Sequence, residues 1–248
     1  MIKIRDLKKR LGTKQVLDGV NLEVEKGETL LVMGRSGTGK SVLLKHIIGL
    51  MTPDAGSIEV DGVELVGLRE NELNAVRRRF GMLFQSGALF DSLTVGENIA
   101  LPLREHTELS EADIQTRVAE RLEWVGLTGV ENMKPASLSG GMKKRVGLAR
   151  AIAMDPQYVL YDEPTTGLDP IMADVIDQLI RSMQKRMGVT SVVVTHDMAS
   201  AFKVADRMAL LNDGRVVFLG TPEEVRTTKD PLVRQFVEGS SEGPIKPV

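Results

Sequence analysis

The chain has 248 residues, of which 42% are hydrophobic and 27% charged, a composition typical of a soluble globular protein with one substantial core. Its formal net charge of −2 gives no global basic footprint, which argues against nucleic acid as the main partner. The chain has no cysteine, so disulfides and thiolate metal sites are excluded.

The first twelve residues, MIKIRDLKKRLG, are charged and strand-like, so we expect no signal peptide there. No apolar stretch approaches the roughly 20 residues that a membrane-spanning helix needs. We therefore expect any membrane role to depend on a partner protein.

A glycine-rich loop, GRSGTGKS, occupies residues 34–41 and follows the apolar run Thr29–Met33. It has the form G-x-x-x-x-G-K-[ST], and residues 42–48 continue as an apolar-faced helix closed by Gly49. A glycine-rich turn that binds nothing is the alternative, but a strand before the loop and a helix after it argue against that. The segment predicts a site for a nucleoside triphosphate.

Each part of this loop has a chemical role. Its glycines let backbone N–H groups point inward at the positive end of the following helix, which favours phosphate. The pattern places Lys40 at the β- and γ-phosphates and the Ser41 hydroxyl on Mg²⁺. We assign the whole loop to phosphate binding: Gly34, Arg35, Ser36, Gly37, Thr38, Gly39, Lys40 and Ser41.

The remaining elements alternate along the chain. A strand-like run at Val20–Val24 precedes the loop, and the Asp61–Gly62 pair between two short apolar runs predicts a hairpin. From about residue 70 to 155 helical periodicity predicts an inserted helical segment, with helices near 71–79, 95–100, 111–125 and 140–154. Strand-like runs return at Tyr158–Tyr161 and Ser191–Thr195 with a helix near 171–187 between them, which is typical of a parallel α/β core.

Two further motifs carry chemistry. The apolar strand at 158–161 ends in Asp162 and Glu163, an arrangement that can put one carboxylate near Mg²⁺ and the other near an attacking water, although an N-cap or a solvated turn explains the pair equally well. The sequence LSGGM at 138–142 predicts either a second anion-binding helix start or a simple N-cap. The combination, with about 20 residues between the motifs, is far more specific than either part.

Together these motifs resemble the nucleotide-binding subunits of ATP-binding cassette (ABC) transporters over roughly residues 1–225. GRSGTGKS matches the Walker A motif, Gln85 the Q-loop, LSGGM the signature, YVLYDE Walker B, TTGLDP the D-loop and His196 the switch histidine. The resemblance implies an α/β fold with a P-loop NTPase (RecA-like) core, an antiparallel β subdomain and an inserted helical subdomain.

The same resemblance implies one ABC ATPase domain over residues 1–240. The core and β subdomain are expected at about 1–85 and 155–225, and the helical subdomain at about 86–154. A C-terminal extension covers 226–248, and its last ten residues, GSSEGPIKPV, are expected to be mobile unless a partner orders them.

Roles follow from the family pattern. Glu163 is implied as the general base, His196 as a contact to the γ-phosphate, and Ser41, Gln85 and Asp162 as Mg²⁺ ligands, directly or through water. Two copies are implied to pack head to tail, so that ATP on one copy is closed by the signature of the other. Ser139, Gly140 and Gly141 then reach the partner's ATP, and Asp169 couples the two sites.

The chain departs from the family pattern at two places. Met142 replaces the usual glutamine of the signature, and Leu11, with Arg10 beside it, stands where many members stack an aromatic ring on adenine. An arginine or aliphatic platform, or loose base selectivity, would account for the second departure. We expect His46 and His106 to be structural or solvated.

Residues 82–110, the LSGGM variant and the ending 230–239 are similar to the ATPases of the Mla (maintenance of lipid asymmetry) phospholipid system and relatives that serve Mce-type proteins. This implies a transmembrane permease, an Mce-type lipid-binding protein and an accessory subunit as partners, at the cytoplasmic face of the inner membrane. The permease is implied to dock beside Gln85, where Phe84, Leu89 and Phe90 are either contacts or core residues.

The sequence thus predicts an ATP hydrolase that drives phospholipid movement between membranes through a separate permease. One alternative is a soluble ABC-type ATPase acting on nucleic acid or ribosomes, but such proteins usually carry tandem cassettes or long coiled-coil insertions. Another is an importer or exporter of a different substrate. A small-molecule P-loop kinase would leave LSGGM, the D-loop and His196 unexplained.

Overall fold

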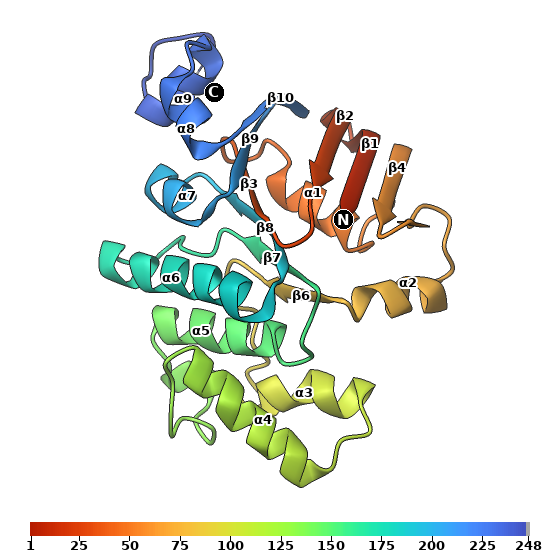
Figure 1. Cartoon of the computed structure of the whole chain (residues 1–248), viewed down its shortest axis with the longest axis vertical. Helices are drawn as coiled ribbons and strands as arrows, with labels where there is room; N and C mark the ends of the chain where they lie inside the picture. Colours follow the sequence, from red (N-terminus) through yellow and green to blue (C-terminus); the bar gives the residue numbers. More distant parts are fainter. Residues whose placement is uncertain (247–248) are drawn as a thin grey trace. The chain divides into compact units, whose positions relative to one another are not determined.

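The computed structural model describes residues 1–246, and the chain forms two compact units (Figure 1). Unit 1 comprises Met1–Leu68 and the residues from Val192 onward, and unit 2 comprises Arg69–Ser191. Unit 2 begins before and ends after the helical subdomain expected at 86–154, whose bounds stay a prediction. Among residues 1–246 no helix is both long and apolar enough to cross a lipid bilayer.

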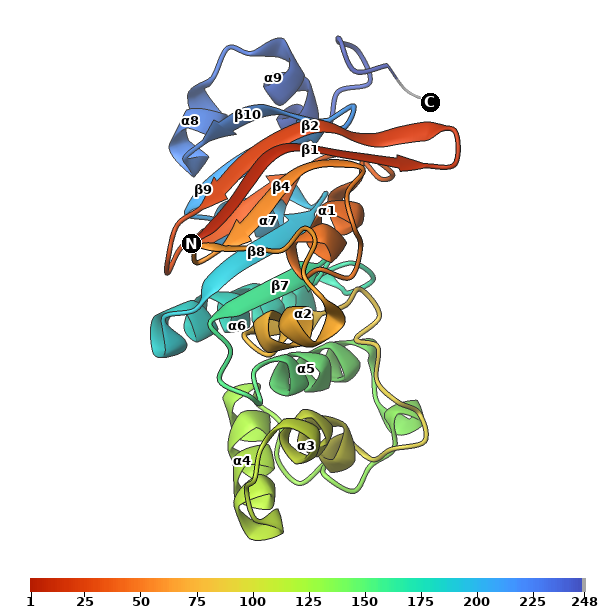
Figure 2. The same cartoon turned by 90° about the vertical axis from the view of Figure 1, so that its right-hand side faces the viewer.

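An antiparallel sheet with the order β2-β1-β4-β5 forms one part of unit 1. The central strand β1 pairs on both sides, with Ile2 opposite Val24 of β2 and Val60 of β4. Ile2 and Ile4 alternate with more exposed residues and are fully buried, so one face of the sheet belongs to the core. Figure 2 shows β1 and β2 as one long hairpin. The strands are β1 (Ile2–Leu11), β2 (Lys14–Val24), β4 (Ala55–Val60) and β5 (Val63–Glu64).

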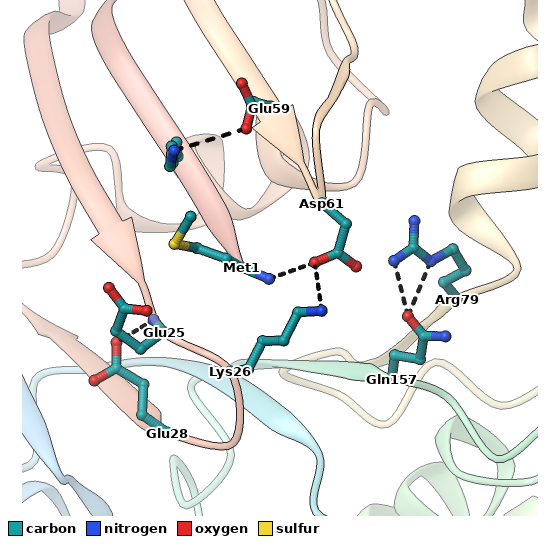
Figure 3. Close-up of polar contacts among 9 residues, drawn as sticks. Met1, Glu25, Lys26, Glu28, Glu59, Asp61, Arg79 and Gln157 are labelled. Carbon is teal, nitrogen blue, oxygen red and sulfur yellow. Dashed lines mark hydrogen bonds and ion pairs between the residues drawn. The ribbon is translucent and has the colours of Figure 1, made fainter.

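The predicted hairpin at Asp61–Gly62 is confirmed. Asp61 and Gly62 connect β4 to β5 and have φ angles of 48° and 83°, the left-handed values that a two-residue hairpin turn requires. The amino group of Met1 donates a hydrogen bond of 2.6 Å to Oδ1 of Asp61, and Nζ of Lys26 lies 3.4 Å from the same oxygen (Figure 3). The turn therefore also fixes the start of β1.

The rest of unit 1 carries strands of a second sheet and short helices. β9 (Arg207–Asn212) pairs parallel to β3 (Thr29–Met33) and antiparallel to β10 (Arg215–Gly220). All five residues of β3 are buried, as expected for a strand with both faces covered. The helices of this unit are α1 (Lys40–Ile47), α7 (Met198–Val204), α8 (Pro222–Thr227) and α9 (Pro231–Glu238).

In unit 2, two parallel strands lead toward the predicted acidic motif. β6 (Phe80–Leu83) pairs with β7 (Tyr158–Asp162), and the rings of Phe80 and Tyr158 stack with centroids 4.8 Å apart. Just before these strands, the guanidinium of Arg79 donates two hydrogen bonds of 2.8 and 3.1 Å to the Gln157 side-chain oxygen (Figure 3). These hydrogen bonds join the residues that directly precede β6 and β7, where the two strands begin side by side.

Three helices of unit 2, α3, α4 and α5, pack against one another (Figure 2). α3 continues past the predicted end at residue 100 through Pro102 to His106, and α5 ends at Ala151, three residues before the predicted end. α6 ends at Met187, as predicted, and Gly188 follows as its C-cap in the left-handed conformation. β8 (Thr190–Thr195) runs from unit 2 into unit 1. The helices are α2 (Glu70–Arg77), α3 (Val95–His106), α4 (Glu111–Trp124), the 3₁₀ turn η1 (Pro135–Ser137), α5 (Gly140–Ala151) and α6 (Pro170–Met187).

The segment that follows α9 contacts α9 and the phosphate loop, all within unit 1. The buried Gln235 amide donates to the Ile245 carbonyl at 2.8 Å and accepts from the Ile245 N–H at 2.6 Å. The Arg35 guanidinium donates to the Lys246 carbonyl at 2.7 Å, beside a cavity of about 260 Å³ lined by residues of α9 and this segment. The expected mobility of residues 239–248 stays a prediction, and its last two residues lie outside the described part of the chain.

Candidate nucleotide site

The phosphate loop of unit 1 connects β3 to α1, as predicted. Gly37 and Gly39 have φ angles of 76° and 102°, which L-residues rarely adopt. A Cβ at Gly39 would lie 3.0 Å from side-chain atoms of Val16 and Leu17, and one at Gly34 would lie 2.5 Å from the Leu211 carbonyl oxygen. The glycines are therefore required by both backbone conformation and close packing.

Lys40 is buried at the first position of α1 and lies back over the loop. Its Nζ donates hydrogen bonds to the carbonyls of Gly34 at 2.7 Å and Arg35 at 3.0 Å. In the described part of the chain no side chain caps the N-terminus of α1, whereas a side chain caps each helix from α3 to α9. The start of α1 is the positive end of the helix dipole, which favours an anion.

His196, the other predicted site residue of unit 1, follows β8 and is exposed. The neighbouring Asp197 caps α7 by accepting from the N–H groups of Ala199 and Ser200, and its own N–H donates to Oγ1 of Thr195 at 3.0 Å. The backbone on both sides of His196 is therefore fixed by local hydrogen bonds.

Asp162 and Glu163 lie in unit 2, where β7 ends, and each is only 8% exposed. Glu163 has a left-handed φ of 49°. Its carboxylate Oε2 accepts from the Thr166 hydroxyl at 3.1 Å, and its main-chain carbonyl accepts from Nζ of Lys144 at 3.0 Å. Both the backbone and the side chain of the predicted general base are held.

Lys144 is a functional candidate that the sequence analysis missed. It is 5% exposed on α5, and burial lowers its pKa to about 8, although the carboxylates of Glu163 and Asp162 act in the opposite direction. In the sequence it belongs to the polar run Lys143–Arg145, which looks like a solvated helix face. Only the tertiary contact distinguishes it from its neighbours.

The signature and D-loop residues sit at helix starts. Oγ of Ser139 caps α5 by accepting from the Met142 N–H at 3.3 Å, and Oδ1 of Asp169 caps α6 by accepting from Ile171 and Met172 N–H at 3.0 Å each. Gly140 and Gly141 follow the first cap. Ser139 and Asp169 therefore each cap a helix of their own chain. Their contacts with the ATP of a second copy stay predictions.

Gln85 is exposed in the loop between β6 and α3. Two side chains form hydrogen bonds to the backbone of this loop. Arg150 donates to the carbonyls of Gly87 at 3.0 Å and Ala88 at 2.8 Å. The fully buried Asn98 accepts from the Phe90 N–H at 2.8 Å and donates to the Phe90 carbonyl at 3.1 Å. Neither Arg150 nor Asn98 belongs to a motif that would predict this role from the sequence.

Of the three predicted docking residues, Phe90 is 51% exposed, while Phe84 and Leu89 are partly buried. A single exposed aromatic ring is common on protein surfaces, so the exposure of Phe90 makes it accessible to a partner without requiring one. Phe90 is thus the residue of the three that a partner can reach most readily.

The residues near the expected adenine position are exposed. Leu11, at the tip of the β1–β2 hairpin, is 43% exposed, and Nε of Arg10 donates to the Gln15 side chain at 3.4 Å. Lys14 Nζ donates to the Gly37 carbonyl at 3.3 Å, which links this hairpin to the phosphate loop. The hairpin therefore offers an aliphatic and a cationic side chain in place of an aromatic ring.

His46 and His106 lie where a structural and a solvated residue are expected. His46 is fully buried on α1 with Nδ1 2.7 Å from the Val42 carbonyl oxygen, and burial lowers its pKa. His106 is exposed at the end of α3.

Each unit carries its own share of the predicted site. Unit 1 holds the phosphate loop and His196, and unit 2 holds Gln85, the signature, Asp162, Glu163 and Asp169. Among residues 1–246 no group of three or more His, Asp or Glu side chains is arranged to hold a metal ion. The predicted Mg²⁺ set has one carboxylate, one hydroxyl and one amide, all of them the oxygen ligands that Mg²⁺ prefers.

A family model described as ABC transporter matches residues 17–166, more than half of the chain. The chain belongs to the ABC transporter family. The resemblance inferred from the motifs is thereby confirmed, and so is the α/β P-loop fold.

Curated relatives cover nearly the whole of this ABC protein. The intermembrane phospholipid transport system ATP-binding protein MlaF of Haemophilus influenzae is 43% identical over 99% of the chain and 93% of its own length. MlaF of Escherichia coli K12 is 41% identical over 99% of the chain and 91% of its own length. A probable ribonucleotide transport ATP-binding protein, mkl, of Mycobacterium leprae is 43% identical over 98% of the chain and 70% of its own length.

Solved ABC cassettes have the same fold. A dimeric bacterial ABC transporter cassette superimposes with a TM-score of 0.84 at 36% identity, covering 90% of this chain and 99% of that one. A dimeric cassette in a post-hydrolysis state with ADP and Pi gives a TM-score of 0.83 at 35% identity, with the same coverage. The protein is an ATP-binding ABC subunit with ATP hydrolase activity.

Proposed function

We propose that this ABC ATPase drives the movement of phospholipids between membranes, together with a transmembrane permease and an Mce-type lipid-binding protein. The observation that carries the proposal is the similarity to two MlaF proteins over almost the full length of both chains. An accessory subunit and a position at the cytoplasmic face of the inner membrane belong to the same proposal.

In this proposal hydrolysis works by positioning and by neutralising charge, as is general for phosphoryl transfer to water. Lys40 and the N–H groups at the start of α1 hold the phosphates, and His196 contacts the γ-phosphate. Glu163 accepts a proton from the attacking water. Mg²⁺, held by Ser41, Gln85 and Asp162, would supply positive charge at the phosphate oxygens.

The proposed assembly contains two copies of the chain packed head to tail. A single phosphate loop per chain and the dimeric state of the two solved cassettes support this arrangement. The N-terminus of α5, where Ser139 and Gly140 are exposed and Gly141 is buried, then meets the ATP of the second copy. Asp169 couples the two sites from the exposed start of α6.

Docking of the permease is proposed at the loop that follows Gln85. Phe90 is half exposed there while Asn98 and Arg150 hold the surrounding backbone, so the ring is presented on a rigid support. A preorganised aromatic anchor loses little entropy when it binds.

The decisive experiment is co-expression of this chain with the permease from its own genomic neighbourhood, purification by a tag on this subunit, and measurement of ATP hydrolysis. We expect a stable complex whose rate of hydrolysis at saturating ATP changes with phospholipid and is not stimulated by added ribonucleotides other than ATP. A response to ribonucleotides alone would favour the transport activity that the name of mkl states. Failure to assemble with any permease would favour an ABC ATPase not coupled to transport.

A matched pair of variants tests the docking surface in the same assay. Phe90→Ser should reduce recovery of the permease while leaving ATP binding by the isolated subunit unchanged. Leu109→Ser is the control, because Leu109 is also exposed but follows α3 in the sequence, whereas Phe90 precedes it. Equal recovery of the permease with Phe90→Ser and the parent chain would contradict docking at this loop.

A further inference from the structure

Glu163 stands out among the residues with unusual backbone conformations. Among residues 1–246, six non-glycine residues have a positive φ: four aspartates (Asp6, Asp61, Asp155 and Asp213), Ala88 and Glu163. Aspartate tolerates this region because its short side chain hydrogen-bonds locally, whereas glutamate has no such advantage. The surrounding structure must therefore hold the main chain of Glu163 in place.

The contact that holds it comes from a buried cation. The Lys144 ammonium, 5% exposed, donates to the Glu163 carbonyl oxygen at 3.0 Å, and the Thr166 N–H donates to the same oxygen at 3.3 Å. Burying an ammonium group is unfavourable unless it is paired. Two donors on one carbonyl oxygen fix the orientation of the peptide plane that follows Glu163, and with it the direction in which the side chain leaves the backbone.

Lys144 acts on the backbone of Glu163 through this hydrogen bond. The carboxylate has a separate partner, since Oε2 accepts from the Thr166 hydroxyl at 3.1 Å. Replacing Lys144 therefore removes the hydrogen bond to the backbone and leaves the Thr166 hydroxyl on the carboxylate.

The helix that carries Lys144 begins at the signature motif. Ser139 caps α5, and Lys144 follows five residues later, about 7.5 Å along the helix axis. A helix of this length moves as a rigid element, so a displacement of its N-terminus also displaces the ammonium. Lys144 thus links the segment proposed to meet ATP of a second copy with the Glu163 of its own chain.

We propose that Lys144 is a positioning residue for Glu163: its buried ammonium holds the Glu163 carbonyl and so sets the direction of the carboxylate that activates water. The inference rests on the proposed role of Glu163 as general base. Lys144 is thus a residue of α5 that takes part in hydrolysis through its contact with Glu163 of the same chain.

The test compares variants of the full chain in the assembly in which the parent hydrolyses ATP. Lys144→Met removes the donor and keeps the length of the side chain, Lys144→Arg restores a cationic donor, and Lys143→Met is the matched control on the partly exposed neighbouring position. Because misplacement of about 1 Å can cost on the order of 100-fold, we expect Lys144→Met to lower kcat at least ~10-fold with KM for ATP nearly unchanged. Lys144→Arg should recover most of the kcat, and Lys143→Met should match the parent.

A double variant separates positioning from general support of the fold. If Lys144 acts through Glu163, Lys144→Met should not reduce the residual hydrolysis of Glu163→Gln any further. A further loss, a kcat of Lys144→Met near that of the parent, or a rise in KM without a fall in kcat would overturn the inference. If thermal unfolding shows that Lys144→Met does not fold, Lys144→Gln takes its place, and the same outcomes support or overturn the inference.

The two proposals fail in different ways. Hydrolysis retained by Glu163→Gln would remove the proposed general base, and the inference about Lys144 with it. Loss of hydrolysis in Glu163→Gln combined with full activity of Lys144→Met would overturn only the role of Lys144.

Discussion

Glu163 combines burial, a held backbone and a held carboxylate, which are the properties expected of a base that must meet water in one geometry. Replacing its carboxylate by an amide removes the proton acceptor and keeps the shape. We therefore expect Glu163→Gln to lower kcat by a factor of about 10² to 10⁴ and to retain ATP in a closed dimer. Single-turnover hydrolysis and sedimentation with ATP measure both effects. Near-normal turnover would exclude Glu163 as the base.

Lys40 is the residue proposed to bind the phosphates, and the hydrogen bonds of its Nζ to the carbonyls of Gly34 and Arg35 place the ammonium over the loop. Lys40→Ala should weaken ATP binding at least ~10-fold, since charge-assisted contacts to phosphate contribute about 1.5 to 3 kcal/mol each. A direct binding titration measures this. Lys45→Ala on the exposed face of α1 is the control, and equal affinities for the two variants would refute the role of Lys40.

His46 should make the stability of the fold depend on pH. Burial lowers its pKa in the folded state, with Lys9 acting in the same direction and the Val42 carbonyl and Asp54 opposing it. Below the unfolded pKa of about 6.5 the unfolded chain binds a proton that the folded chain resists, so stability is lost as the pH falls. Denaturant unfolding between about pH 5 and 7 should show this slope, and His46→Gln should flatten it. An unchanged slope in the variant would assign the effect to other groups.

Asn98 shows how a single side chain organises an element. Its amide holds the backbone of the loop that carries Gln85 and Phe90, with further hydrogen bonds to the carbonyls of Leu93 and Thr94. Asn98→Ala would leave several buried polar groups without partners, and we expect a loss of at least ~2 kcal/mol in unfolding free energy. Hydrogen exchange should increase first at the N–H of Phe90. Thr116→Ala on the exposed face of α4 is the control, and a similar small loss in both variants would contradict the role of Asn98.

At the scale of elements, the sequence predicts those features that depend on local geometry. The turn at Asp61–Gly62, the end of α6 at Gly188 and the phosphate loop each follow from residues that favour a particular backbone conformation. Asp213–Gly214, between the apolar runs of β9 and β10, carries the same signal and forms the same kind of turn, with φ angles of 46° and 74°. α3 runs through Pro102, which a local rule would place near a helix end.

The supports of the candidate site are harder to predict. Lys144, Asn98 and Arg150 look like ordinary polar residues of surface helices, and only tertiary packing makes two of them buried and directs all three at main-chain carbonyls. A periodicity of polar and apolar residues cannot distinguish a solvated lysine from one that is buried on a hydrogen-bond acceptor. The motif residues were therefore predictable, and the residues that hold them were not.

For the whole molecule, the chain divides the proposed chemistry between two units. Unit 1 carries the loop that holds phosphate, and unit 2 carries the base, the signature and the exposed Phe90. The proposed motor uses both sets of residues in each of two copies. Hydrolysis and lipid movement should therefore be lost together when either set is disabled.

The most direct measurement is therefore ATP-dependent transfer of a labelled phospholipid between two populations of vesicles, one of which contains the permease complex built on this chain. Our proposal predicts transfer that requires hydrolysable ATP and disappears in the complex carrying Glu163→Gln. Transfer that continues without ATP or in that variant, or an active ATPase that moves no phospholipid in either direction, would contradict it.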